Sequence, residues 1–399
     1  MDTQLDNVER AILWNLWAIR GVRHRHLEAM RDRGSLDSLW DLGERAREEL
    51  FRDLDVGKAA RGHLHRRIES VDDPVSGFEA EQSGLPPGSR IVSRWDDAYP
   101  VRLVDLEEPP SFLYVRGDLG ACRATDTISV VGSREVDVSD ARRARQIVAD
   151  VAQAGVRIVS GGAFGVDRVA HEASMDSGTP TVVVFAGGLD QPTPRSNMAT
   201  FRRAAQSGAW ITEYPLRTDV RPHHFRRRNR LIAALGDVTF VVRAGEKSGT
   251  MLTARAAQKI DRPVCTLPGR PEDELAQGCL TLLVEGAQAV RHATDILEIY
   301  FPDRPESPRS DEPPAKIDSE AGSAPSLPPI PDSVSEDAQE LLECVRNSNL
   351  DPGKPIEPDE LAAACGWEAS KIQTVLLELE LHGVCGKKPG ANLYDFRPI

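Results

Sequence analysis

The chain has 399 residues and a formal net charge of −13, with 49 Lys and Arg against 62 Asp and Glu. This length favours two or three domains, and the acidic balance argues against coating a polyanion by bulk charge, although a local basic groove is compatible with it. The N-terminus lacks a signal-peptide layout, no apolar run could span a bilayer, and six cysteines lack C-x-x-C spacing. The sequence therefore predicts a cytoplasmic protein with reduced thiols, no membrane partner and no zinc site.

The first 85 residues are predicted to form a small helical domain. Glycines at positions 21, 34 and 43 separate short helical patterns, as helix stops do. Leucines and tryptophans at helical spacing are expected to form a small core, namely Leu13, Trp14, Leu16 and Trp17. The expected helices cover 7–19, 23–34, 35–43 and a charged stretch that ends near residue 70.

Residues 91–300 are predicted to form a Rossmann-like α/β domain. Short β-branched runs alternate here with helical patterns of ten to fifteen residues, which indicates a doubly wound, mostly parallel sheet covered on both faces. The expected strands lie at 127–131, 156–160, 181–188, 209–214, 238–244 and 263–269. The expected helices lie at 140–155, 166–178, 196–207, 229–236 and 249–260.

The C-terminal part is predicted to consist of a linker and a second folded domain. Residues 301–335 are crowded with Pro, Ser and acidic side chains and are expected to be disordered. Residues 336–399 show three helical patterns followed by two short strands around "KKPG". That order is typical of a winged helix-turn-helix domain.

Four loops of the α/β domain combine small residues with a cation or a helix start. They follow predicted strands, and ligands of doubly wound sheets bind beyond the carboxyl ends of the strands. Each loop alone is compatible with an ordinary tight turn. Together they favour a polyphosphate or phosphodiester ligand, because glycines and helix N-termini expose amides to anions. The loops are Gly132–Arg134, Ser160–Ala163, Leu189–Asn197 and Gly245–Ala254, and their cations are Arg134, Arg195 and Lys247.

The same loops lack the usual marks of a nucleotide-binding enzyme. The segment "GGAFGVD" is not a G-x-G-x-x-G fingerprint, and no P-loop is present. Asp167 and His171 are spaced to share one face of a helix, but no partner Ser, Cys or carboxylate cluster accompanies them. We expect Asp167 to brace the glycine-rich loop and His171 to be a packed, hydrogen-bonded helix residue.

The strongest local charge lies in "LRTDVRPHHFRRRNRLIAAL", residues 216–235. A charge run is usually a solvated face, but this one leads into a buried helix, so some arginines must point into the domain or its groove. Arginine with an interleaved aromatic, here Phe225, suits single-stranded nucleic acid through phosphate neutralisation and base stacking. The basic residues are Arg217, Arg221, His223, His224, Arg226, Arg227, Arg228 and Arg230, opposed by Asp219.

Eight motifs in this order resemble the DprA/Smf family of DNA-processing proteins. They are "VGSR", "SGGAFGVDRVAH", "GGLD…PTPRSN", "GAWITEYP", "HHFRRRNRLIAAL", "KSGTMLTARAA", "LPG" and "GCLTLLVEGA". The resemblance covers about residues 95–295, and the flanks fit a helical SAM-like or helix-hairpin-helix region before it and a winged helix after it.

The resemblance implies a cytoplasmic, non-enzymatic, dimeric protein without a cofactor that binds single-stranded DNA. Family members protect incoming DNA during natural transformation and load the RecA recombinase onto it. Arg243 stands where relatives often carry an acidic residue, which predicts a more basic mouth of the groove at the carboxyl edge of the sheet. The residues that the resemblance assigns to DNA binding are Gly132, Ser133, Arg134, Ser160, Gly161, Gly162, Phe164, Asp167, Arg195, Asn197, Arg227, Arg228, Asn229, Arg230, Lys247, Ser248 and Thr250.

Two other classes of protein remain open at this stage. Nucleotide-hydrolysing, lysine-decarboxylase-like enzymes share the fold and carry a catalytic Glu after a Gly-Gly-x-Gly-Thr motif. Gly249-Thr250 lacks that Glu at the expected offset. A winged-helix regulator with a nucleotide-sensing α/β domain is the third possibility, but the C-terminal domain is only weakly basic, which favours a role in protein contacts.

Overall fold

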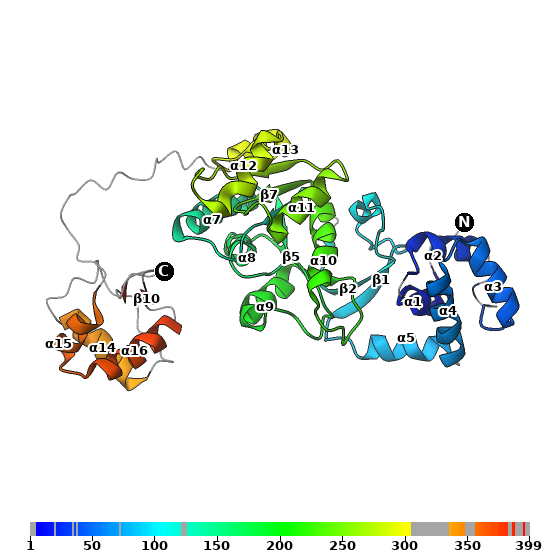
Figure 1. The fold of residues 1–399 in the computed structure, drawn as a ribbon, viewed down its shortest axis with the longest axis horizontal. Helices are drawn as coiled ribbons and strands as arrows, with labels where there is room; N and C mark the ends of the chain where they lie inside the picture. Colours follow the sequence, from blue (N-terminus) through cyan, green and yellow to red (C-terminus); the bar gives the residue numbers. More distant parts are fainter. Residues whose placement is uncertain are drawn as a thin grey trace. The chain divides into compact units, whose positions relative to one another are not determined.

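The computed structural model describes residues 5–19, 21–33, 36, 39–71, 73–120, 126–304, 335–347, 356–381, 385–387 and 394–395. The chain divides into two compact units, Met1–Arg309 and Ser310–Ile399 (Figure 1). Most of the predicted linker, residues 301–335, lies outside the described residues.

A single large sheet organises the first unit. Within the described residues it has nine strands in the order β1-β2-β6-β5-β4-β3-β7-β8-β9. The strands from β3 onward run parallel to one another, and β2 is antiparallel to both β1 and β6. This confirms the predicted Rossmann-like, mostly parallel sheet. The bounds are β1 Ser89–Ser93, β2 Phe112–Gly117, β3 Thr127–Val131, β4 Arg157–Ser160, β5 Thr181–Val184, β6 Ala209–Thr212, β7 Val238–Val241, β8 Val264–Thr266 and β9 Gln288–Ala289.

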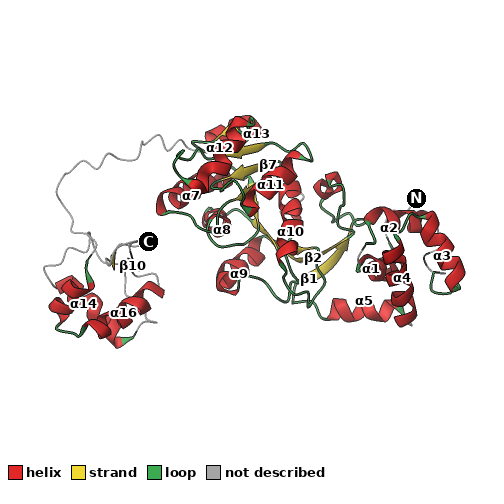
Figure 2. Ribbon diagram, in the orientation of Figure 1, coloured by secondary structure: helices red, strands yellow, loops and turns green. Residues whose placement is uncertain are grey.

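Helices cover both faces of the sheet (Figure 2). Successive strand side chains point to opposite faces, so Ile128 and Val130 pack against α7 and α8, whereas Val131 packs against α10 and α11. The strands are therefore buried on both sides, which explains their continuous β-branched runs. The bounds are α7 Val138–Gln153, α8 Val166–Asp176, α9 Met198–Ser207, α10 Pro222–Leu235, α11 Gly249–Gln258, α12 Gln277–Val284 and α13 Thr294–Tyr300, with short 3-10 turns η1 Val101–Asp105, η2 Arg195–Asn197 and η3 Glu274–Ala276.

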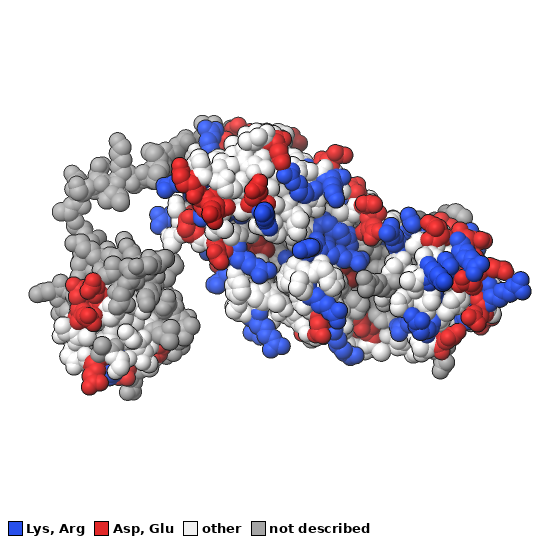
Figure 3. All heavy atoms as spheres, in the orientation of Figure 1, with Lys and Arg blue, Asp and Glu red and all other residues white. Residues whose placement is uncertain are grey.

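Charge is unevenly distributed over this unit. On the face in view in Figure 3, Lys and Arg atoms gather over the region of α10, whereas Asp and Glu atoms gather near α7. The net negative charge of the chain therefore coexists with a local basic surface.

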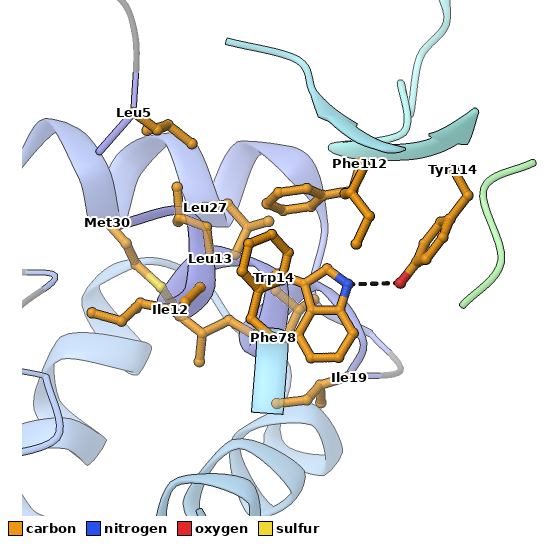
Figure 4. Close-up of a cluster of buried hydrophobic side chains, with 14 of the residues drawn as sticks. Leu5, Ile12, Leu13, Trp14, Ile19, Leu27, Met30, Phe78, Phe112 and Tyr114 are labelled. Carbon is orange, nitrogen blue, oxygen red and sulfur yellow. Dashed lines mark hydrogen bonds between the residues drawn. The ribbon is translucent and has the colours of Figure 1, made fainter. Parts of the chain in front are cut away.

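The N-terminal helices share their core with the sheet. The Trp14 indole N–H donates to the Tyr114 hydroxyl at 2.8 Å (Figure 4). The rings of Trp17 and Phe112 lie 5.5 Å apart between centroids. The predicted core residues Leu13, Trp14, Leu16 and Trp17 do pack together, but their core is continuous with that of the sheet. The first helix and α9 both contribute side chains to the cluster that contains Phe112 and Tyr114.

Two helix predictions in this region were wrong. The described part of 35–43, Leu36 and 39–43, contains no helix, and an additional helix follows at Pro74–Ser83. The signal for that helix is present in the sequence, since Asp73 caps it through the amides of Val75 and Ser76 and Pro74 is its first residue. The bounds are α1 Asn7–Trp17, α2 His24–Asp32, α3 Glu44–Asp53, α4 Lys58–Ser70 and α5 Pro74–Ser83.

The second unit has the order predicted for a winged helix. Three helices precede an antiparallel pair of short strands, with Leu341, Leu361 and Leu376 in its core. None of the described helices of either unit is long and apolar enough to cross a membrane. The bounds are α14 Glu336–Asn347, α15 Pro358–Cys365, α16 Ala369–Leu381, β10 Gly386–Lys387 and β11 Tyr394–Asp395.

Candidate nucleic-acid interface

The four predicted loops follow four adjacent strands of the sheet. These strands lie in the order β5-β4-β3-β7 and are mutually parallel. Their carboxyl ends therefore meet at one edge, as the sequence predicts. The order along the sheet reverses between β4 and β7 around β3, which is the usual position of a ligand site in such folds.

The glycine-rich loop between β4 and α8 is shaped by close backbone contacts. Gly162 and Gly165 have φ values of +69° and +70°. A Cβ on Gly165 would lie 2.4 Å from the Ser133 carbonyl oxygen, so this position requires glycine. Phe164 lies between them with its side chain exposed, at 45 % of its full accessible surface. The loop therefore presents one aromatic ring to solvent, whereas Ser160, Gly161 and Gly162 are buried.

Two of the predicted site residues lie beneath this loop rather than on it. Arg228 is 5 % exposed and donates from Nη1 to the Gly161 carbonyl at 2.7 Å and to the Val184 carbonyl. Asn197 is 1 % exposed and donates from Nδ2 to the carbonyls of Gly162 and Ala163, at 3.0 and 3.2 Å. Burial lowers the pKa of Arg228 to about 10, so its guanidinium stays charged at neutral pH.

Asp167 braces the loop, as predicted. Its Oδ2 accepts from the Ala163 amide at 3.2 Å, and the side chain is buried. Burial raises the pKa of this carboxyl, opposed by the nearby Arg228 guanidinium. Ser160, at the end of β4, is also buried and donates from its hydroxyl to the Val130 carbonyl at 2.7 Å.

His171 is a packed helix residue, which confirms the second expectation for α8. Its Nδ1 lies 2.8 Å from the Thr181 hydroxyl, which itself donates to the Ile158 carbonyl at 3.0 Å. Nδ1 is therefore the donor in this contact, and Nε2 is left without a partner among the described residues. Burial lowers the pKa of His171 to about 3, so the ring is neutral at physiological pH.

The three predicted loop cations are exposed. Arg134, Arg195 and Lys247 form no ion pair with any residue in the part of the chain that the structure describes. The Arg134 guanidinium lies 5.6 Å from the centroid of the Phe225 ring, which joins the loop after β3 to the first turn of α10. These charges are therefore available to an anionic ligand.

The remaining predicted loop residues shape the turns. A Cβ on Gly132 would lie 2.5 Å from the Val166 side chain, so the β3 turn packs directly on α8. The Ser133 amide donates to the Arg243 carbonyl at 2.7 Å. Ser248 occupies the N-cap position of α11 without a side-chain capping bond, since its buried hydroxyl has no partner among the described residues. Half-buried Thr250 follows in the first turn.

The arginine-rich segment divides its charges between the interior and solvent. Arg227 and Arg230 both pair with Glu213, which is 3 % exposed, and Arg230 also donates to the Glu108 carbonyl at 2.6 Å. Asn229 donates to the Gly249 carbonyl at 3.2 Å and ties α10 to α11. Arg226 is exposed and has no ion pair with any described residue. Arg226 is a free cation that the predicted set of DNA-binding residues leaves out.

The prediction that Arg243 makes the mouth more basic was wrong. Its side chain is 10 % exposed and pairs with Asp137 and Asp140, both at 2.6 Å, and with Asp273 at 2.7 Å. Three carboxylates more than balance one guanidinium, so this part of the edge is not basic. Within the described ranges, no group of three or more His, Cys, Asp or Glu is placed to hold a metal ion.

The sequence comparisons define the family. Residues 90–301 match the sequence model of "DNA recombination-mediator protein A", and residues 324–391 match that of the DprA winged helix domain. The chain belongs to the DNA recombination-mediator protein A family. It is 33 % identical over 321 residues to a DprA-type DNA processing protein of Mycobacterium tuberculosis, covering 76 % of each chain. It is also 31 % identical over 315 residues to Escherichia coli Smf, covering 76 % of this chain and 77 % of that protein.

Solved structures agree with this assignment. The Streptococcus pneumoniae DNA processing protein A superposes with a TM-score of 0.64 at 25 % identity, covering 74 % of this chain and 99 % of that one. The Helicobacter pylori protein, described for its unique single-stranded DNA binding mode, has a TM-score of 0.50 at 29 % identity and covers 54 % of this chain and 97 % of that one.

Proposed function

We propose that this protein binds single-stranded DNA at the carboxyl edge of its sheet and delivers the strand to a RecA-class recombinase during transformation or recombination. The observation that carries the proposal is the set of exposed, unpaired cations on adjacent loops, Arg134, Arg195 and Lys247. They lie on the same sheet edge as a glycine-rich loop that exposes Phe164. Family membership and the single-stranded DNA binding of the Helicobacter pylori relative support the choice of ligand.

The features of this edge suit a single strand better than a duplex. Cations that follow a phosphate backbone need aromatic rings beside them to hold unpaired bases by stacking. Phe164 is exposed on the loop, and half-buried Phe225 carries the Arg134 guanidinium over its ring. Bases in a duplex are already stacked on one another, so these rings favour the unpaired form.

The direct test is a salt titration of binding to labelled oligothymidine and to a duplex of equal length. We expect tighter binding of the single strand, with an affinity that falls linearly with salt on logarithmic axes. Equal affinity for both forms, or binding that does not respond to salt, would contradict the proposal.

We also propose that the edge holds DNA without cleaving it or hydrolysing nucleotides. In support, the two candidate titratable side chains of α8 are bound internally, Asp167 by the Ala163 amide and His171 by the Thr181 hydroxyl. Sustained turnover of nucleoside monophosphates or of DNA by the pure protein, abolished in Asp167→Asn, would overturn this part.

The proposed partners are a second copy of the chain and the recombinase. A symmetric dimer would place two short DNA sites on one strand and raise avidity without new contacts. Sedimentation measures whether the protein is a dimer. Delivery is measured as the rate of recombinase filament assembly on single strands coated with a single-strand-binding protein, which this protein should increase. If a monomeric protein still accelerated filament assembly, the proposed dimer would not be needed for delivery.

A further inference from the structure

Three consecutive carbonyls of the glycine-rich loop face the protein interior. Arg228 binds the Gly161 carbonyl, and Asn197 binds those of Gly162 and Ala163. Both donors are almost completely buried, at 5 % and 1 % exposure. Neither side chain can reach a ligand outside the loop without giving up these bonds.

The bonds to the loop carbonyls also fix the directions of the loop amides. In a planar trans peptide, the N–H of one residue points opposite to the carbonyl of the residue before it. The bond from Arg228 to the Gly161 carbonyl therefore directs the amide of buried Gly162 away from the Arg228 guanidinium. The bond from Asn197 to the Ala163 carbonyl directs the amide of exposed Phe164 away from Asn197.

The amide of Phe164 is left without an internal partner. The Ala163 amide before it donates to Asp167 at 3.2 Å. The Phe164 amide has no acceptor among the described residues, and Phe164 itself is exposed. An unpartnered donor at a glycine-rich turn before a helix matches the needs of a phosphate oxygen.

We infer that Arg228 and Asn197 are positioning residues of the proposed DNA site: from inside, they hold the glycine-rich loop in the conformation that offers the Phe164 amide to a backbone phosphate. This inference rests on the proposed function and assigns the two residues a role other than phosphate contact. It divides the arginines of α10 into two kinds. Arg226 is exposed, and its charge is available to the ligand. Arg228, two residues later, donates its hydrogen bonds to the loop.

The two kinds of arginine predict different salt dependence. A cation that neutralises a phosphate releases counterions, and its loss reduces the logarithmic salt slope by about 0.7 for single strands. A neutral amide releases none. Arg228 is buried and bound to loop carbonyls, so its loss should leave the number of neutralised phosphates unchanged.

The experiment compares Asn197→Ala, Arg228→Met and the matched control Arg226→Met in the full chain with labelled oligothymidine. For Asn197→Ala and Arg228→Met we expect about tenfold weaker binding at every salt concentration, with the slope of the wild type. For Arg226→Met we expect a slope reduced by about 0.7. Hydrogen exchange across residues 160–166 should slow on DNA addition in the wild type and not in Asn197→Ala.

The outcomes separate the inference from the proposed function. A slope reduced in Arg228→Met as in Arg226→Met makes Arg228 a phosphate contact and overturns the inference. A folded Asn197→Ala variant that binds oligothymidine with wild-type affinity also overturns the inference. If Arg228→Met does not fold, the result for Asn197→Ala alone tests the inference. If the wild-type chain shows no salt-dependent binding to the single strand, the proposed function itself fails.

Discussion

Two regions of the sheet edge each contain a buried arginine, and they use it in opposite ways. In the loop region, Ser160–Gly165 with the side chains beneath it, Arg228 binds backbone carbonyls. In the aspartate region, Arg243 is held by Asp137, Asp140 and Asp273. The first bond pattern fixes the conformation of the loop, and the second neutralises the charge within the fold. The number of arginines in a segment therefore does not measure the positive charge that a ligand meets.

The largest expected effect follows from removing the free cations beside the loop region. In Arg134→Gln/Arg195→Gln we expect single-strand affinity to fall about 100-fold, because each charged contact contributes roughly 1.5 kcal/mol. The salt slope should fall by about 1.4. Lys259→Gln is the control, since Lys259 is exposed after α11, at the amino edge of the sheet. A folded double variant with wild-type affinity and slope would contradict the assignment of these cations.

Breaking the aspartate region should affect stability and not binding. In Arg243→Met, three carboxylates lose their partner, and we expect the free energy of unfolding to fall by about 2 kcal/mol. This value allows for the partial exposure of the aspartates, whose side chains are 22 to 53 % exposed. Denaturant unfolding measures the loss, and oligothymidine affinity should stay within about twofold. A large loss of affinity with unchanged stability would mean that Arg243 serves the ligand.

The loop region should show acid sensitivity through His171. Its pKa is about 3 in the folded protein and 6.5 without burial, so only the unfolded state takes up the proton between these values. Stability is therefore present above pH 6.5 and lost as the pH falls toward 3. Between pH 7 and pH 5 we expect a loss of roughly 1 to 2 kcal/mol in the wild type that is missing in His171→Leu. Parallel pH profiles for the two proteins would show that His171 does not carry this sensitivity.

The smallest effect is expected from removing the second unit. A chain ending at Arg309 keeps both regions of the edge, since the division of the chain falls there. We expect it to dimerise and to bind oligothymidine within about twofold of the full chain. A fragment that stays folded but is monomeric, or loses DNA binding, would place the winged helix in the interface.

The sequence predicts the common edge of the four loops because the carboxyl ends of parallel strands in βαβ units meet at one edge of the sheet. It does not predict which arginines are free. One signal was available: His224, Arg228, Leu231 and Leu235 follow helical spacing, and all four are buried in α10. That pattern places Arg228 inside. By contrast, the pairing of Arg243 with Asp273 joins residues 30 positions apart in separate loops, and no local pattern reveals such a contact.

The bond between Trp14 and Tyr114 has a consequence for how the chain can be divided. The family match begins at residue 90, yet the aromatic face of β2 is covered by α1, which lies far upstream. A fragment cut at residue 90 would leave Phe112 and Tyr114 uncovered, and we expect such a fragment to aggregate. The boundary of sequence similarity is therefore not a boundary of cooperative unfolding. The N-terminal helices cannot be exchanged for those of a relative unless the partner aromatics of β2 are exchanged with them.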